Sequence, residues 1–130
     1  MTVPATAPYA ALLALLFIAL SARVIRQRGA SKVALGFAGA PVLERAARVH
    51  ANFAEYVPLA PLLTLLTELS GYPRWLVHTA GLALVLGRLS HAWGVSQSAE
   101  NFRFRVAEMG TTFGVLGILS LLLPGAAFVR

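Results

Sequence analysis

Hydrophobic and polar positions divide this chain of 130 residues into four long apolar segments separated by short polar stretches. The segments are about Tyr9–Ala22, Arg45–Leu69, Leu76–Gly94 and Val106–Leu123. Continuous apolar runs of this length predict helices, whereas membrane barrels are built from shorter segments of alternating polarity. With flanking residues that extend each helix, we predict helices at about 5–26, 43–70, 74–96 and 103–123, in one domain over residues 1–130.

Composition places these helices in a membrane. Hydrophobic residues make up 58% of the chain, charged residues 12%, and the mean hydropathy is +0.73. Soluble domains carry about 25% charged residues. Because backbone groups in lipid must be satisfied within a helix or a closed barrel, the sequence predicts an all-α, integral membrane four-helix bundle.

The positive charge of the chain is concentrated at two places. Eleven Lys and Arg residues against five acidic ones give a net charge of +6, which in a soluble protein would suggest nucleic acid. Here the basic residues follow the first apolar segment or precede the fourth; they are Arg23, Arg26, Arg28, Lys32, Arg103 and Arg105. The positive-inside rule then predicts that these two loops are cytoplasmic and that both termini lie on the opposite side. Because this distribution explains the positive charge, we expect no nucleic-acid partner.

The sequence lacks the residues that several kinds of site require. The chain has no cysteine, which excludes a disulfide, a thiolate nucleophile and a thiolate metal site. Its three histidines stand in different contexts, so we expect no metal. A short chain without a retention signal at its end is typical of a bacterial inner-membrane protein.

The second segment begins with a polar face. This face follows a helical spacing of three or four positions, with the last two residues adjacent; it consists of Arg45, Arg48, Asn52, Glu55 and Tyr56. Ionisable residues at membrane depth usually line an internal site. Arginine can bind a carboxylate with two hydrogen bonds, glutamate can bind an ammonium group, and asparagine can pair with a peptide group. This face therefore suits a small zwitterionic ligand. The alternative is that the two arginines are anchors whose side chains reach the headgroups.

Individual residues predict local features in and before the second segment. Glu44 precedes Arg48 by four positions, the favourable order for an ion pair within a helix. Pro58 and Pro61 each remove a backbone donor and predict a kink in mid-helix. Between residues 27 and 41, glycines and polar residues predict a loop of about 15 residues.

The run from Glu44 to Pro58 reads Glu-Arg-x-x-Arg-x-x-x-Asn-x-x-Glu-Tyr-x-Pro and resembles the signature of the membrane-associated proteins in eicosanoid and glutathione metabolism (MAPEG). This family includes the microsomal glutathione transferases. The resemblance implies a homotrimer that binds glutathione between neighbouring subunits near the cytoplasmic face. Carried over by position, the residues that would hold glutathione are Arg48, Asn52, Glu55 and Tyr56. A basic residue of the first loop often helps in the family, and Arg26, Arg28 and Lys32 all qualify here.

The third segment carries Arg88 and His91, three positions apart on one face. The resemblance implies that both contact glutathione. For His91 the alternative is a half-buried histidine bonded to a helix carbonyl. Val95 stands on the same face where family members commonly have tyrosine, so this sequence departs from the family pattern there.

The resemblance also implies an arginine near the start of the fourth helix that stabilises the glutathione thiolate. A free thiol has a pKa near 8.5, and a fixed neighbouring cation lowers it. We favour Arg105, which precedes the apolar segment by fewer residues, with Arg103 as the alternative. Both also fit the role of cytoplasmic anchors. Glu108 lies one turn beyond Arg105, where its carboxylate would weaken the positive field.

The sequence thus predicts a membrane-embedded glutathione transferase. It would conjugate glutathione, as substrate or as cofactor, to a lipophilic electrophile that enters from the bilayer at a subunit interface. The alternative is a non-catalytic scaffold or small-ligand-binding member of the same fold, which Val95 and Glu108 favour. A transporter fits less well, because a polar face at one end of one helix makes no path across the membrane.

Overall fold

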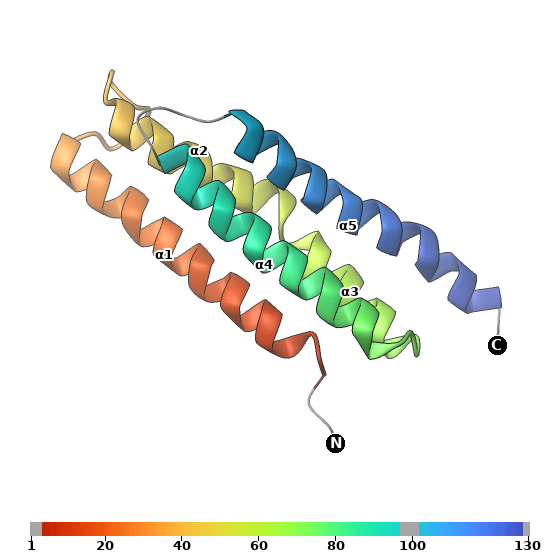
Figure 1. Ribbon diagram of the computed structural model, residues 1–130. Coiled ribbons are helices and arrows are strands. Elements are labelled where there is room, and N and C mark those ends of the chain that lie inside the picture. Colours follow the sequence, from red (N-terminus) through yellow and green to blue (C-terminus); the bar gives the residue numbers. More distant parts are fainter. Residues whose placement is uncertain (1–3, 97–101, 129–130) are drawn as a thin grey trace.

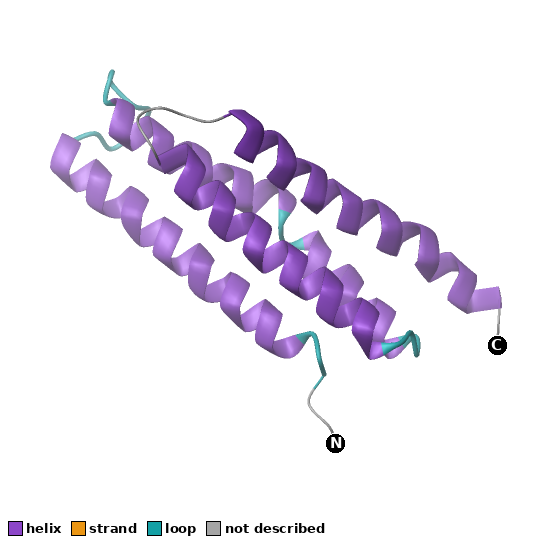
Figure 2. Ribbon diagram, in the orientation of Figure 1, coloured by secondary structure: helices purple, strands orange, loops and turns teal. Residues whose placement is uncertain are grey.

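The computed structural model describes residues 4–96 and 102–128, and its described elements are all helices (Figures 1 and 2). They are α1 (Ala7–Ser31), α2 (Pro41–Tyr56), α3 (Leu59–Leu69), α4 (Arg74–Ser96) and α5 (Phe102–Phe128). Helices α2 and α3 follow one another as a single interrupted rod, so the described residues form four rods, and α4 contacts the other three. The first turn of α1 and the last turn of α5 lie at the same end of the bundle (Figure 1).

Helix α1 continues to Ser31, beyond the predicted end at residue 26. It stops at Lys32, whose backbone is left-handed (φ 54°) and whose N–H bonds to carbonyls of the last turn. The following loop is tied to the helix, because Arg28 Nη1 donates to the carbonyls of Val33 and Gly36 at 3.3 and 3.0 Å. The predicted loop is therefore shorter than the sequence indicated, and Arg28 itself holds it.

The predicted kink separates α2 from α3. Pro58 and Pro61 have no N–H to continue the helical hydrogen bonds. The carbonyl of Val57, which Pro61 cannot bond, accepts instead from the N–H of Ala60 at 3.0 Å. The rod thus bends without leaving this carbonyl unpaired.

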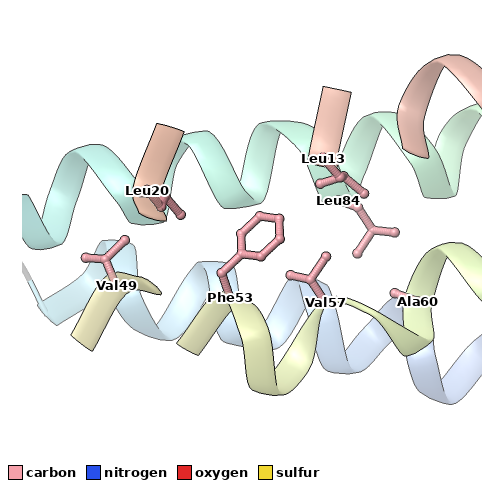
Figure 3. Close-up of a cluster of buried hydrophobic side chains, with 7 residues drawn as sticks. All are labelled: Leu13, Leu20, Val49, Phe53, Val57, Ala60 and Leu84. Atoms are coloured by element: carbon pink, nitrogen blue, oxygen red, sulfur yellow. The ribbon is translucent and has the colours of Figure 1, made fainter. Parts of the chain in front are cut away.

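The hydrophobic core lies between α1, the α2–α3 rod and α4. It consists of Leu13, Leu20, Val49, Phe53, Val57, Ala60 and Leu84 (Figure 3). The Phe53 ring occupies the middle of this cluster and is 5% exposed. Inside a bilayer such contacts hold helices together through close packing, since lipid tails are as apolar as leucine. This core fixes the rotation of α2, and with it the direction of the polar face.

The outer surface is apolar. Large side chains such as Leu15, Ile18, Ile25 and Leu121 are more than half exposed. Two helical stretches, Ala7–Ser31 and Phe102–Ala126, are long and apolar enough by length and composition to cross a membrane. An exposed surface of this kind is suited to contact with lipid or with other helices.

Candidate functional site

Helix α2 has two distinct faces. Leu43, Ala46, Val49 and Phe53 are buried against the rest of the bundle. The polar residues lie on the other side of the helix, at the helical spacing of three and four positions. The apolar face is therefore packed, and the polar face is directed away from the core.

The polar face forms one wall of a cavity of about 690 Å³. Ligand sites of proteins usually measure about 300–1,000 Å³. The cavity is lined from α2 by Pro41, Glu44, Arg45, Arg48, Ala51, Asn52, Glu55 and Tyr56, from α4 by His91, and from α5 by Arg105. Its charged lining comprises three arginines and two glutamates. The cavity thus offers both signs of charge with an excess of cations.

The cavity brings together six of the eight predicted site residues: Arg48, Asn52, Glu55, Tyr56, His91 and Arg105. Arg88 and Arg103 are not among its lining residues. Arg103 is exposed on α5, and the basic candidates Arg26 and Lys32 are exposed near the end of α1. Val95 belongs to α4, but its side chain lies outside the described part of the structure.

Arg88 lies behind the cavity wall, in a buried polar cluster. Its side chain is 1% exposed, and its Nη2 contacts Glu108 Oε1 at 2.9 Å. The same guanidinium donates to Thr112 Oγ1 at 2.9 Å and to the side-chain oxygen of Asn52. Asn52 also reaches α5, with its Nδ2 3.5 Å from Met109 Sδ. Arg88 thus positions Asn52, which lines the cavity, and connects α2, α4 and α5.

Glu108 makes contacts with two residues of α4. Its Oε1 pairs with Arg88, and its Oε2 lies 2.7 Å from His91 Nδ1. The Glu108 side chain is 1% exposed and that of His91 4%. A buried charge is tolerated only when it is paired, and Arg88 supplies the opposite charge for this carboxylate. Both carboxylate oxygens thus contact α4, and Oε1 also accepts from Thr112 Oγ1 of α5 at 3.3 Å.

Sequence reasoning did not identify this cluster. The signal was present, because Glu108 and Thr112 stand four positions apart inside the predicted fourth membrane helix, where a carboxylate is costly. The predicted pair of Glu44 and Arg48 is confirmed, with Glu44 Oε1 3.9 Å from Arg48 Nη2. Their side chains are 49% and 69% exposed, so this pair contributes little stability.

Aromatic contacts fix the start of α5 and the rim of the cavity. Phe104 packs edge-on against Trp93, with ring centroids 6.1 Å apart. Tyr56 contacts Phe113 in the same geometry at 5.6 Å. These contacts join the first half of α5, which also carries Arg105, to α4 and α2.

A second cavity of about 330 Å³ lies on the other side of the α2–α3 rod. Its lining is apolar and comes from α1, α2, α3 and the break between them; it includes Ala10, Leu13, Ala14, Phe17, Phe53, Ala54, Val57, Pro58 and Pro61. None of the predicted site residues lines it. Of these two cavities, the first has charged residues in its lining and the second has none.

Comparison with known proteins gives one family. The model of the MAPEG family matches residues 6–125. The chain is also similar to a protein called inner membrane protein YecN from Escherichia coli strain K12, with 39% identity over 116 residues, covering 89% of this chain and 87% of the relative. The YecN protein of E. coli O6:H1 matches to the same extent. The match includes both α2 and α5, which carry most of the cavity lining.

Proposed function

The chain belongs to the MAPEG family, and from this premise we propose that it is a membrane-embedded glutathione transferase that conjugates glutathione to a lipophilic electrophile. The observation that carries the proposal is the charged cavity. Six of the residues that the family resemblance implies line it, and Arg105 is one of these six. Residues from three helices contribute to it, so its composition is not a consequence of one amphipathic helix.

The lining matches the chemistry of glutathione. The tripeptide has two carboxylates, one ammonium group and two peptide bonds, and it gains another negative charge when the thiol ionises. Arg48 and Arg45 offer guanidinium groups to the carboxylates, Glu55 offers a carboxylate to the ammonium, and Asn52 an amide to a peptide group. The cationic excess of the lining favours the anionic, ionised form of the ligand.

In this proposal Arg105 stabilises the thiolate. It lines the cavity at the start of α5, whereas Arg103 is not among the lining residues. A fixed cation beside a thiol favours the thiolate, which is the nucleophile. Positioning and one cation are enough for this chemistry, because a thiolate attacks an activated carbon without further covalent catalysis.

We further propose a homotrimer in a bacterial inner membrane, with both termini on the side away from the cytoplasm. In the single chain, the Arg48 side chain is 69% exposed although it lines the cavity. A neighbouring subunit that covers this side would exclude water and strengthen the contacts between charged groups and glutathione. The name of the E. coli relative supports the choice of membrane.

The second candidate is a non-catalytic member that binds a small ligand or serves as a scaffold. The buried Arg88 is already paired with Glu108, and Val95 replaces the tyrosine common in the family. Under this reading glutathione binds, if at all, as a neutral thiol.

The test uses purified protein whose subunit number is measured by light scattering. Glutathione is added, its binding is followed by calorimetry and its thiolate by ultraviolet absorbance at neutral pH. We expect binding and a thiolate signal. Arg105→Ala should lower turnover with a model electrophile at least tenfold with a smaller change in affinity, because the cation acts on the ionised sulfur.

Arg103→Ala is the matched control and should leave both quantities almost unchanged. The reverse pattern would assign activation to Arg103. Binding without a thiolate signal would favour the non-catalytic candidate, and no binding would reject the glutathione site.

A further inference from the structure

His91 and Glu108 meet at the wall of the charged cavity. His91 lines the cavity, although its side chain is only 4% exposed. Its Nδ1 lies 2.7 Å from Glu108 Oε2 in a close charge contact, and among the described residues neither of these buried atoms has a hydrogen-bond partner. The two nitrogens of an imidazole lie on different edges of the ring. With Nδ1 engaged by the carboxylate, Nε2 is the nitrogen left for the cavity.

The neighbouring charges determine the state of this imidazole. Arg88 Nη2 lies 2.9 Å from Glu108 Oε1, so Glu108 faces His91 as the acidic partner of a buried ion pair. A carboxylate 2.7 Å from Nδ1 repels an unprotonated nitrogen and attracts an N–H. The proton of neutral His91 is therefore assigned to Nδ1, and Nε2 presents a lone pair. A carboxylate in this position also stabilises the imidazolium that forms when Nε2 accepts a proton.

We propose that His91 is the base that takes the thiol proton of bound glutathione, and that Glu108 is the positioning residue that holds its ring. This inference rests on the proposed function and adds the fate of the proton to it. The S–H bond breaks, both electrons stay on sulfur, and the proton forms an N–H bond at Nε2. Arg105 then faces the thiolate, and Glu108 the imidazolium.

The proton leaves His91 in the conjugation step. The thiolate electron pair forms the bond to the electrophilic carbon. In a substitution, the leaving group departs with its electron pair and takes the proton from Nε2; in an addition, the carbanion takes it. Either course restores neutral His91 for the next thiol.

Other titratable or charged groups share this space. From α2 they are Glu44, Arg45, Arg48, Glu55 and Tyr56, from α4 Arg88, and from α5 Arg105 and Glu108. The arginines cannot accept a proton under these conditions. A carboxylate, the side chain of Glu44 and Glu55, is a weaker base than an imidazole. His91 supplies the imidazole of the lining, the side chain that most often serves as a general base.

The experiment measures the number of protons released to solvent per thiolate formed. Calorimetry of glutathione binding in two buffers of different ionisation enthalpy gives the protons released, and ultraviolet absorbance gives the thiolate formed. If the thiol proton stays on His91, wild-type protein at neutral pH releases about zero protons per thiolate, whereas release to solvent gives about one. His91→Gln and Glu108→Gln should each raise this ratio toward one.

His50→Gln is the matched control. His50 lies on α2, contacts Ser21 on α1, and does not line the cavity. Its replacement should keep the wild-type ratio. A purely structural role of Glu108 would change affinity or stability in Glu108→Gln but not the number of protons released per thiolate.

A second measurement does not require a change at the site. The chain has three histidines, so the double variant His50→Gln, His78→Gln retains His91 alone. Infrared difference spectra of this variant should show imidazole turning into imidazolium as the thiolate forms, in equal amounts.

Three results would overturn the inference. A thiolate that forms while His91 stays neutral, with about one proton released by wild-type protein, rejects His91 as the base and leaves the transferase proposal intact. Binding without a thiolate rejects the base and favours the non-catalytic candidate. Absence of glutathione binding rejects both proposals together.

Discussion

Arg88 shows how one residue can matter for a site that it does not line. Its guanidinium is buried and contacts Glu108, Thr112 and Asn52, which lie on two other helices. The family resemblance implies a glutathione contact for Arg88, and Arg88 is not among the residues that line the cavity. The geometry gives it a positioning role, since it pairs with the Glu108 carboxyl group and donates to the side-chain oxygen of Asn52.

Replacement of Arg88 with Met should destabilise the protein by about 3–5 kcal/mol, because it leaves a buried carboxylate without its cation. Thermal unfolding in detergent would measure the loss. Arg26→Met, on the exposed surface of α1, is the control and should change stability by less than about 0.5 kcal/mol. Adding Glu108→Leu to Arg88→Met should recover part of the loss, because no buried charge remains. Equal stability of the two arginine variants would mean that the cluster does not hold the helices together.

At the scale of elements, close contact between α1 and α4 depends on a glycine. Gly81 is buried, and a methyl group added to it would overlap with the ring of Tyr9. That ring is held by a hydrogen bond between Tyr9 Oη and His78 Nδ1 of 2.8 Å. Glycine at this position therefore leaves room for the Tyr9 ring between α1 and α4.

Gly81→Ala should destabilise the bundle by about 1–3 kcal/mol, since Tyr9 must move and its contact with His78 must break. Thermal unfolding measures this as well. Gly29→Ala on α1 is the control, because no atom lies within 4 Å of its added methyl group. It should be neutral or stabilise by up to about 1 kcal/mol, through higher helix propensity. Unchanged stability of Gly81→Ala would show that the Tyr9 ring can move without cost.

For the whole molecule, the arrangement of the ends connects the fold to the membrane. The prediction of an all-α membrane bundle is confirmed by the described helices and by the family. Helix α1 begins and α5 ends at one end of the bundle, while the loop over residues 32–40 lies at the other (Figure 1). The basic residues near that loop and at the start of α5 predict that this second end faces the cytoplasm.

The absence of cysteine permits a direct test of orientation. In intact cells stripped of their outer membrane, a membrane-impermeant maleimide should label Pro4→Cys. Ala34→Cys, in the exposed loop, should be labelled only after the membrane is permeabilised. Unaltered protein serves as the blank. Labelling in the opposite order would reverse the proposed topology and move the charged cavity to the other side of the membrane.

The sequence alone determined the features that depend on local periodicity. The apolar runs predicted the helices, and the prolines predicted the break between α2 and α3. The spacing of polar residues predicted the polar face of α2. The end of α1 was misjudged, because its last turn depends on Arg28 and a left-handed Lys32, which apolar periodicity does not record.

Tertiary structure decided which faces meet. Spacing shows which residues share a face of one helix, but the rotation and depth of one helix against another depend on packing across the bundle. Only this packing turned Glu108 toward Arg88 and His91 and brought Arg105, but not Arg103, to the cavity. The residue types of the site were thus readable from the chain, whereas their partners were set by the contacts between α2, α4 and α5.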